Sequence, residues 1–234
     1  MEKLNGVKVA DWEIVDHNSN REEGYEYEEV SVSELLNKVK MSDAQKDDWG
    51  RKYFAINIHI MVSVQTLPFV MEVIKDRMTD PRLAKMNAIV FLGVKPKGRA
   101  KGTYDPLPAD KYAMIVKLCL ALNIPFGFDS CSAPRFEKAV DNMNIKPELK
   151  SELKMMSESC ESSLFSSYIN TLGEYWHCSF SEENENVDSV NVLEANDFLK
   201  DVWHNPVVKD FRDKTISSAC NGCRECVVYP EINV

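Results

Sequence analysis

The middle of the chain alternates apolar runs of strand length with segments of helical periodicity. Residues 54–64, 88–94 and 124–129 have the length and composition of strands, and residues 67–78 and 108–122 show the apolar spacing of amphipathic helices. This order of elements is typical of α/β proteins, in which successive strands pair in parallel. The sequence therefore predicts a parallel sheet whose strands are joined by helices.

The predicted strand and helix pairs are too few to close a barrel. An N-terminal strand at 7–15 and a helix at 32–40 bring the total to about four units, whereas a closed barrel of eight units usually needs about 250 residues. The alternation stops near residue 140, and a stretch rich in serine and acidic residues follows. We therefore expect an α/β protein in which a parallel half barrel, residues 1–143, precedes a smaller cysteine-rich domain, residues 144–234.

Side chains along the first long strand alternate in polarity. Isoleucines and Val62 fall on one face, and Asn57, His59 and Ser63 fall on the other, because successive strand residues point to opposite sides. In a barrel the aliphatic face would contact the helices, and the polar set would line the interior. A polar face on an ordinary edge strand would show the same pattern, so both interpretations stay open.

Charge and hydropathy limit the partners and the compartment. The chain carries a formal net charge of -9, which argues against general affinity for nucleic acid or anionic membranes, because phosphates bind surfaces rich in Lys and Arg. The longest uncharged apolar stretch is about half the roughly 20 residues of a membrane helix, and no signal segment opens the chain. We therefore expect a cytoplasmic protein whose seven cysteines are reduced thiols.

Five of the seven cysteines lie within residues 160–226, which indicates a site for a soft metal. Cys160 is followed by twelve residues, Gly173, four residues and Cys178. Residues that favour strands flank Gly173, so the segment predicts a hairpin in which this glycine takes a positive φ. The hairpin would bring the two cysteines together.

The segment CNGCREC supplies Cys220, Cys223 and Cys226, each separated from the next by two residues. Cysteines at this spacing can present two thiolates to one metal centre. Together with Cys160 and Cys178 they would suit either Zn²⁺ or an iron-sulfur cluster, and spacing alone does not choose between the two.

The two remaining cysteines have different surroundings. Cys119 lies among apolar residues of a predicted helix, where the role of a buried hydrophobic residue is favoured. Cys131 follows the strand that ends in FGFDS. It is a further candidate ligand, a thiol facing a substrate, or a packing residue.

The spacing of Cys160, Gly173 and Cys178 resembles the auxiliary-cluster signature of the SPASM and twitch subfamilies of radical S-adenosylmethionine (SAM) enzymes. The segments PFGFDSC, YWHCSF and DFLKDVWHNPVVKDFR are similar to segments of those enzymes. The loop KPKGRA resembles one that follows a late strand of their partial barrel, near bound SAM. The resemblance covers residues 54–226; its cysteine spacing is fairly specific, and its barrel part is generic.

The resemblance implies one auxiliary [4Fe-4S] cluster, as in twitch members, held by Cys160, Cys178 and two cysteines of CNGCREC. Such a cluster would take up an electron from a substrate radical or anchor the substrate. The resemblance also implies contacts to SAM or substrate from five residues of the first strand and the KPKGRA loop, for which ordinary strand polarity and a solvated turn remain alternatives: Asn57, His59, Ser63, Lys95 and Gly98.

The chain departs from that family in the motif that starts the chemistry. Family members hold their SAM-cleaving cluster with a C-x-x-x-C-x-x-C loop, and this motif does not occur in the 234 residues, whose first cysteine is Cys119. The chain therefore resembles the C-terminal half of a radical SAM enzyme, which would use SAM only with a separate N-terminal half and would act on a peptide, protein or small metabolite. The alternative is a non-catalytic iron-sulfur or zinc module that docks on a partner protein.

Overall fold

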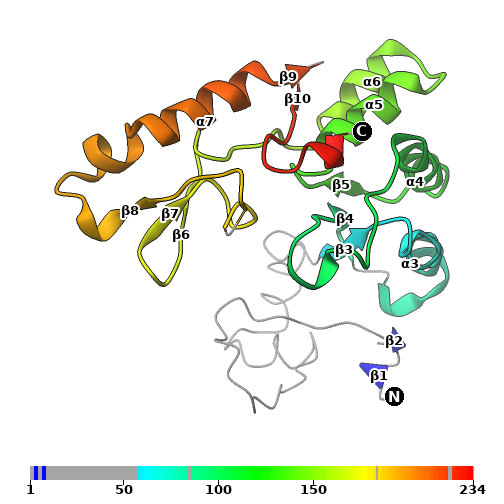
Figure 1. Ribbon diagram of the computed structural model, residues 1–234. Helices are drawn as coiled ribbons and strands as arrows, with labels where there is room; N and C mark the ends of the chain where they lie inside the picture. Colours follow the sequence, from blue (N-terminus) through cyan, green and yellow to red (C-terminus); the bar gives the residue numbers. More distant parts are fainter. Residues whose placement is uncertain are drawn as a thin grey trace, which may run out of the picture.

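Among the described residues, three strands form a parallel sheet (Figure 1). In spatial order they are β3 (Asn57–Val62), β4 (Ala88–Gly93) and β5 (Phe126–Phe128). All three predicted strands are confirmed, and the protein has the predicted α/β character. The computed structural model describes residues 3–4, 7–8, 57–83, 86–182, 184–220 and 223–233.

Helices connect these strands as the sequence predicts. Helix α3 (Leu67–Thr79) joins β3 to β4, and α4 (Ala109–Ala121) joins β4 to β5. A further helix, α5 (Ala133–Asn142), follows β5. Both α3 and α5 begin with a proline in the first turn, where the missing N–H has no intrahelical partner to lose. Figure 1 shows the three helices on the same side of the sheet.

The sheet is buried on one face only. In β4, Ile89 and Phe91 are fully buried against the helices, while Val90 and Leu92 on the opposite face are half-buried. The aliphatic face of β3 packs against the helices in the same way. The described residues form no closed barrel, and they show a sheet with helices on one side.

The main hydrophobic core continues past the predicted domain boundary near Asn144. Helix α6 (Pro147–Lys154) packs against α5, and its Leu153 belongs to the same core as the sheet. The chain then runs along the outer edge of β5, where the Phe128 amide donates to the Met156 carbonyl at 2.8 Å. The sheet therefore fixes the start of the cysteine-rich region.

The predicted hairpin is present in the C-terminal region. Strands β6 (Tyr168–Ile169) and β7 (Glu174–Trp176) pair antiparallel, and β8 (Val190–Asn191) pairs with β7. Gly173 takes a φ of 78° in the turn, and a Cβ there would lie 2.6 Å from the side chain of Leu193. Gly173 thus serves both the backbone conformation and the close packing of the turn.

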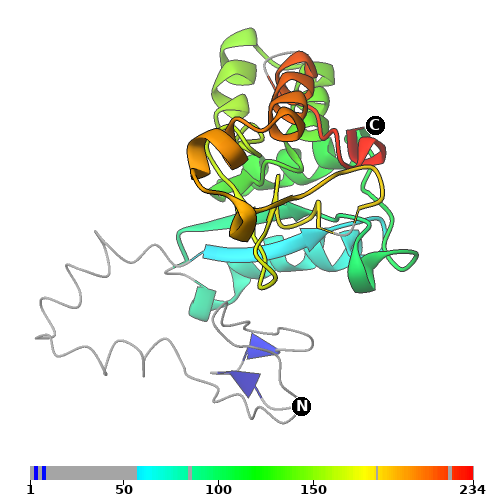
Figure 2. The same ribbon diagram turned by 60° about the vertical axis from the view of Figure 1, so that its left-hand side comes forward.

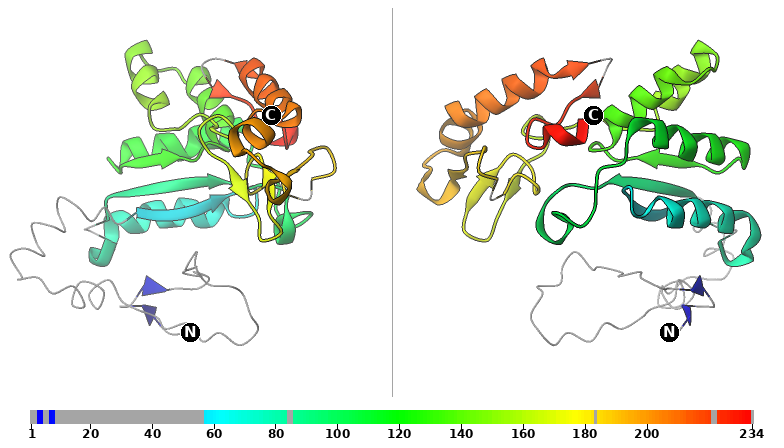
Figure 3. Two further views of the ribbon diagram at one scale, coloured as in Figure 1. Left: turned by 90° about the vertical axis from the view of Figure 1, so that its left-hand side faces the viewer. Right: turned by 45° about the vertical axis from the view of Figure 1, so that its right-hand side comes forward.

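The rest of the C-terminal region lies beyond the carboxyl ends of the parallel strands. The right-hand view of Figure 3 shows the strand arrowheads pointing toward it, and Figure 2 shows the hairpin and the last long helix in front of the sheet. Its remaining elements are the π-helix η4 (Phe198–Trp203), α7 (Pro206–Ser217), the antiparallel pair β9 (Ala219–Cys220) and β10 (Cys223–Arg224), and η5 (Pro230–Asn233).

Short elements complete the described chain. Strands β1 (Lys3–Leu4) and β2 (Val7–Lys8) pair antiparallel with each other, so this part of the strand predicted at 7–15 does not belong to the parallel sheet. The rest of that strand and the helix predicted at 32–40 lie outside the described residues. None of the described helices has the length and apolar character needed to cross a membrane. The remaining short helices are η1 (Pro81–Leu83), η2 (Gly98–Ala100) and η3 (Val192–Glu194).

Candidate metal centre

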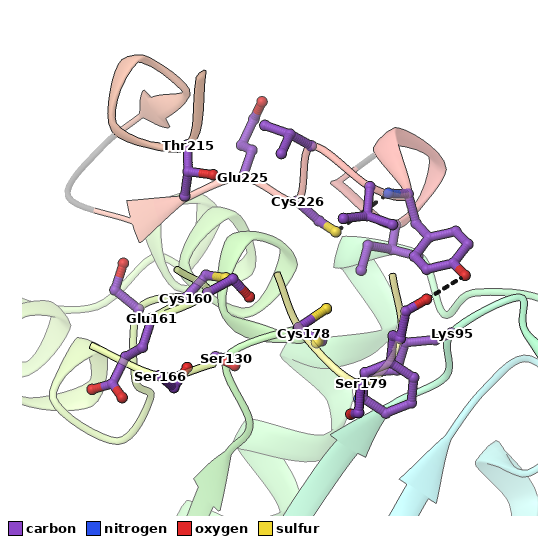
Figure 4. Close-up of a pocket in the computed structure, with 18 of the residues that line it drawn as sticks. Lys95, Ser130, Cys160, Glu161, Ser166, Cys178, Ser179, Thr215, Glu225 and Cys226 are labelled. Atoms are coloured by element: carbon purple, nitrogen blue, oxygen red, sulfur yellow. Dashed lines mark hydrogen bonds between the residues drawn. The ribbon is translucent and has the colours of Figure 1, made fainter. Parts of the chain in front are cut away.

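A cavity of about 220 Å³ lies between the carboxyl ends of β4 and β5 and the C-terminal region (Figure 4). Its walls come from the loops after β4 and β5, the chain before β6, the chain after β7, helix α7 and the final turn. Ligand sites in α/β proteins are typically found at the carboxyl ends of the strands. The cavity is many times larger than the roughly 10–15 Å³ that one water requires, so it can take a sizeable group.

Four cysteines line this cavity: Cys131, Cys160, Cys178 and Cys226. Figure 4 shows Cys160, Cys178 and Cys226 around it. Three of the five predicted ligands are therefore brought together, and Cys131, the further candidate, makes a fourth. They come from segments that are far apart in the sequence.

The pKa values of two of these thiols are affected by the neighbouring cysteines. Burial raises the pKa of Cys131 to about 12, and the neighbouring thiols of Cys160 and Cys226 add to the increase. Burial likewise raises the pKa of Cys226 to about 11, with further contributions from Cys160 and Cys178. These two thiols are thus protonated at neutral pH.

Cys223 does not line the cavity, although it belongs to the same predicted motif. It is buried in β10, and its Sγ atom lies 3.6 Å from the carbonyl oxygen of Arg224. Cys226 lies beyond the end of that strand and reaches the cavity instead. The side chain of Cys220 lies outside the described part of the chain.

Polar contacts hold Cys226 and Cys160 in place. The Cys226 Sγ accepts the backbone N–H of Tyr229 at 3.3 Å, and the Asn233 side chain bonds to the backbone N–H and carbonyl of Cys226. Arg224 donates from its side chain to the Cys160 carbonyl at 2.5 Å. Strand β10 is therefore tied to the chain before β6 beside the cavity.

The KPKGRA loop contacts the segment that carries Cys178. The Lys95 ammonium lies 4.7 Å from the centroid of the Phe180 ring, and Lys97 donates to the Ser179 carbonyl at 3.0 Å. Ser181 closes a turn on the same segment, accepting from the Cys178 N–H and donating to the Cys178 carbonyl. The loop thus helps to position Cys178.

Lys95 is the only cationic side chain among the described residues that line the cavity. Its ammonium lies 2.5 Å from Asp129, whose other carboxylate oxygen accepts from the Gly93 N–H at 2.9 Å and from Ser132. Burial lowers the pKa of Lys95, but the nearby Cys131 and Asp129 more than offset this, and the pKa lies above its ordinary value. Lys95 therefore carries a positive charge beside the cysteines.

The polar residues predicted on the first strand lie away from the cavity. Asn57 and His59 are exposed on β3. Ser63 is fully buried, and its hydroxyl accepts the backbone N–H of Thr66 at 3.0 Å, so it stabilises the turn into α3. None of these three residues lines the cavity.

The two loop residues predicted to contact SAM or substrate have different positions. Lys95 lines the cavity, whereas Gly98 does not. Gly98 begins η2 with a φ of 56°, a conformation that glycine adopts without strain. Its role in the described structure is to turn the loop.

His177 is a supporting residue that the sequence pattern did not identify. Its ring is 2% exposed, stacks on Phe211 with 3.8 Å between centroids, and places Nδ1 2.8 Å from the Ser163 hydroxyl. Burial lowers its pKa to about 4, so it is neutral at pH 7. In the sequence, the position of this histidine directly before Cys178 was the only indication of such a role. Its packing fixes the segment of chain that carries Cys178.

In donor type, the four cavity cysteines match the ligand set of an iron-sulfur cluster. Among the described residues, no three His, Cys, Asp or Glu side chains lie where they could hold one metal ion. Zinc requires its thiolates about 2.3 Å from a single centre. An iron-sulfur cluster is wider and is bound by four cysteine thiolates, and here four cysteines surround one cavity.

Comparisons with known proteins do not assign the chain to a family. Neither the scan against protein-family models nor the searches of curated proteins and solved structures returned a match for this chain.

Proposed function

We propose that Cys131, Cys160, Cys178 and Cys226 bind a [4Fe-4S] cluster, and that the chain works as the auxiliary-cluster half of a radical SAM enzyme. The observation that carries the proposal is the meeting of these four cysteines at one cavity. When bound, the cluster would accept an electron from a substrate radical or anchor the substrate. Thiolate ligands suit this role because they support cluster potentials over a wide range.

The arrangement of the sheet supports the half-barrel part of the proposal. Helices α3, α4 and α5 cover one face of the parallel sheet, as helices cover the outside of a barrel wall. A doubly wound sheet would carry helices on both faces. The cavity lies at the carboxyl ends of the strands, where a barrel enzyme would hold its substrate.

The chain's own residues would prepare the site in two ways. Lys95, held by Asp129, would supply a cation beside the thiolates that partly offsets the negative charge of the cavity wall. The backbone N–H of Tyr229 donates to Cys226. Hydrogen bonds to cluster sulfurs stabilise the more negative reduced form.

Anaerobic reconstitution tests the cofactor. We expect the purified chain to turn brown with iron and sulfide and to absorb broadly near roughly 400 nm, because thiolate-to-iron charge transfer accompanies such ligation. Iron and sulfide analysis should account for one cluster per chain. A colourless protein that binds stoichiometric zinc and no iron would refute the cluster and favour a zinc module.

A second measurement separates an enzyme half from a complete enzyme. Because no C-x-x-x-C-x-x-C motif occurs in these residues, we expect the reconstituted chain alone, reduced with dithionite, to release no 5'-deoxyadenosine from SAM. Adding a polypeptide that carries this motif should restore cleavage if the chain is the partner half. Appreciable turnover by the chain alone would contradict the proposal that a separate polypeptide supplies the SAM-cleaving motif.

A further inference from the structure

Thr215 is a buried polar residue on the wall of the cavity. It lies on α7, it is 1% exposed, and its hydroxyl has no hydrogen-bond partner among the described residues. Figure 4 shows this side chain on the α7 wall with its hydroxyl turned toward the cavity. Buried hydroxyls in proteins nearly always have a partner, so this exception requires an explanation.

The local structure of α7 offers no substitute for the absent partner. A helical threonine can donate to the carbonyl four residues earlier, but Thr215 makes no such bond to Phe211. Its neighbours behave differently, since Ser217 donates to the Lys214 carbonyl at 3.0 Å and Ser218 donates to the Thr215 carbonyl at 2.8 Å. The hydroxyl of Thr215 is therefore available to form a hydrogen bond with a group inside the cavity.

In the proposed function, the hydrogen-bond acceptors inside this cavity would be the sulfur atoms of the cluster and its cysteine ligands. Phe211, one turn before Thr215 on α7, packs under His177 and lines the same wall. Cys226 lines the cavity together with Thr215. With a cluster bound, thiolate or sulfide acceptors would share the cavity with this hydroxyl, and a buried hydroxyl without a partner is costly.

We propose that the Thr215 hydroxyl donates a hydrogen bond to a sulfur of the group held by the four cysteines and thereby raises its reduction potential. This inference rests on the proposed iron-sulfur cluster. The bond stabilises the reduced cluster more than the oxidised one, because the reduced form carries one more negative charge on its iron and sulfur atoms. Thr215 is thus a positioning and tuning residue, and it takes no part in bond making.

The test compares Thr215→Val with two controls after anaerobic reconstitution. Valine has the shape of threonine without its hydroxyl, Thr215→Ser retains the hydroxyl, and Ser217→Ala removes an exposed hydroxyl from the same helix. Iron content is measured first, and the midpoint potential is then measured by a redox titration followed by electron paramagnetic resonance.

We expect Thr215→Val to hold full iron at a more negative potential. At the wild-type midpoint its ratio of reduced to oxidised cluster should fall about tenfold, which equals 59 mV for one electron. Thr215→Ser and Ser217→Ala should keep the wild-type midpoint. Without metal, Thr215→Val should melt no lower than the wild type, because it removes a hydroxyl that has no partner.

Two contrary results have distinct meanings. Full iron in Thr215→Val at an unchanged midpoint overturns the inference about this hydroxyl and leaves the cluster in place. A wild-type chain that takes up no iron overturns the proposed function and this inference together.

Discussion

Replacing Cys178 with alanine is expected to abolish stable iron uptake, whereas replacing Cys119 leaves iron uptake unchanged. Cys178 lines the cavity, and Cys119 is fully buried in the main core on α4. Metal binding in small domains contributes directly to folding free energy, so Cys178→Ala should also lose the increase in melting temperature that iron produces. Cys119→Ala removes one sulfur from packed surroundings, at a cost of about 1 kcal/mol.

A matched pair within CNGCREC sharpens this experiment. Cys226 lines the cavity and Cys223 does not, although the two differ by only three positions in the sequence. Cys226→Ala should behave like Cys178→Ala, and Cys223→Ala should keep its iron. If Cys223→Ala or Cys119→Ala loses the cluster while Cys226→Ala retains it, the four ligands have been assigned incorrectly.

Replacing the buried Arg135 with alanine is expected to have a large effect on the stability of the fold. Its side chain is 2% exposed on α5, donating from Nε to the Ile232 carbonyl and from a terminal nitrogen to the Leu107 carbonyl at 2.8 Å. Burial lowers its pKa, although the guanidinium remains charged. Arg135→Ala leaves two carbonyls without this donor and a void in the core, so we expect a loss of about 3 kcal/mol or more.

Denaturant unfolding of the metal-free protein measures this loss. Hydrogen exchange should also show weaker protection in the final turn, because Arg135 bonds to Ile232 in η5. Lys117→Ala, an exposed change on α4, is the surface control and should alter the free energy of unfolding by no more than about 0.5 kcal/mol. Equal unfolding midpoints for Arg135→Ala and Lys117→Ala would show that the buried guanidinium contributes no net stability.

Periodicity was sufficient to predict the framework of this protein. The strands at 54–64, 88–94 and 124–129 were identified because their apolar residues alternate or form continuous runs. Helix α5 was not predicted, although its buried apolar residues Ala133, Phe136 and Val140 recur at helical spacing. The division of the chain near Asn144 stays a prediction, with Leu153 of the next helix packed into the first core.

The candidate site was only partly accessible from the sequence. Spacing about Gly173 predicted a hairpin and identified Cys160 and Cys178, both of which line the cavity. Spacing could not separate Cys223 from Cys226, because that choice depends on where β10 ends.

Other features of the site depend on contacts between distant segments. The bond from Lys95 to Asp129 joins the loops of two different strands. The unpaired hydroxyl of Thr215 becomes visible only once α7 is placed against the cavity. Neither the Lys95–Asp129 bond nor the unpaired hydroxyl can be predicted from a local sequence pattern.

The scattered origin of the four cavity cysteines has a consequence for biosynthesis. A ribosome releases Cys131 well before Cys226, so a growing chain passes through a stage in which the strands have emerged and the set of thiols is incomplete. The cavity closes only after α7 and the final turn have emerged and returned to the ends of β4 and β5. Contacts between such distant segments form slowly, so the proposed cluster would enter only at a late stage of folding.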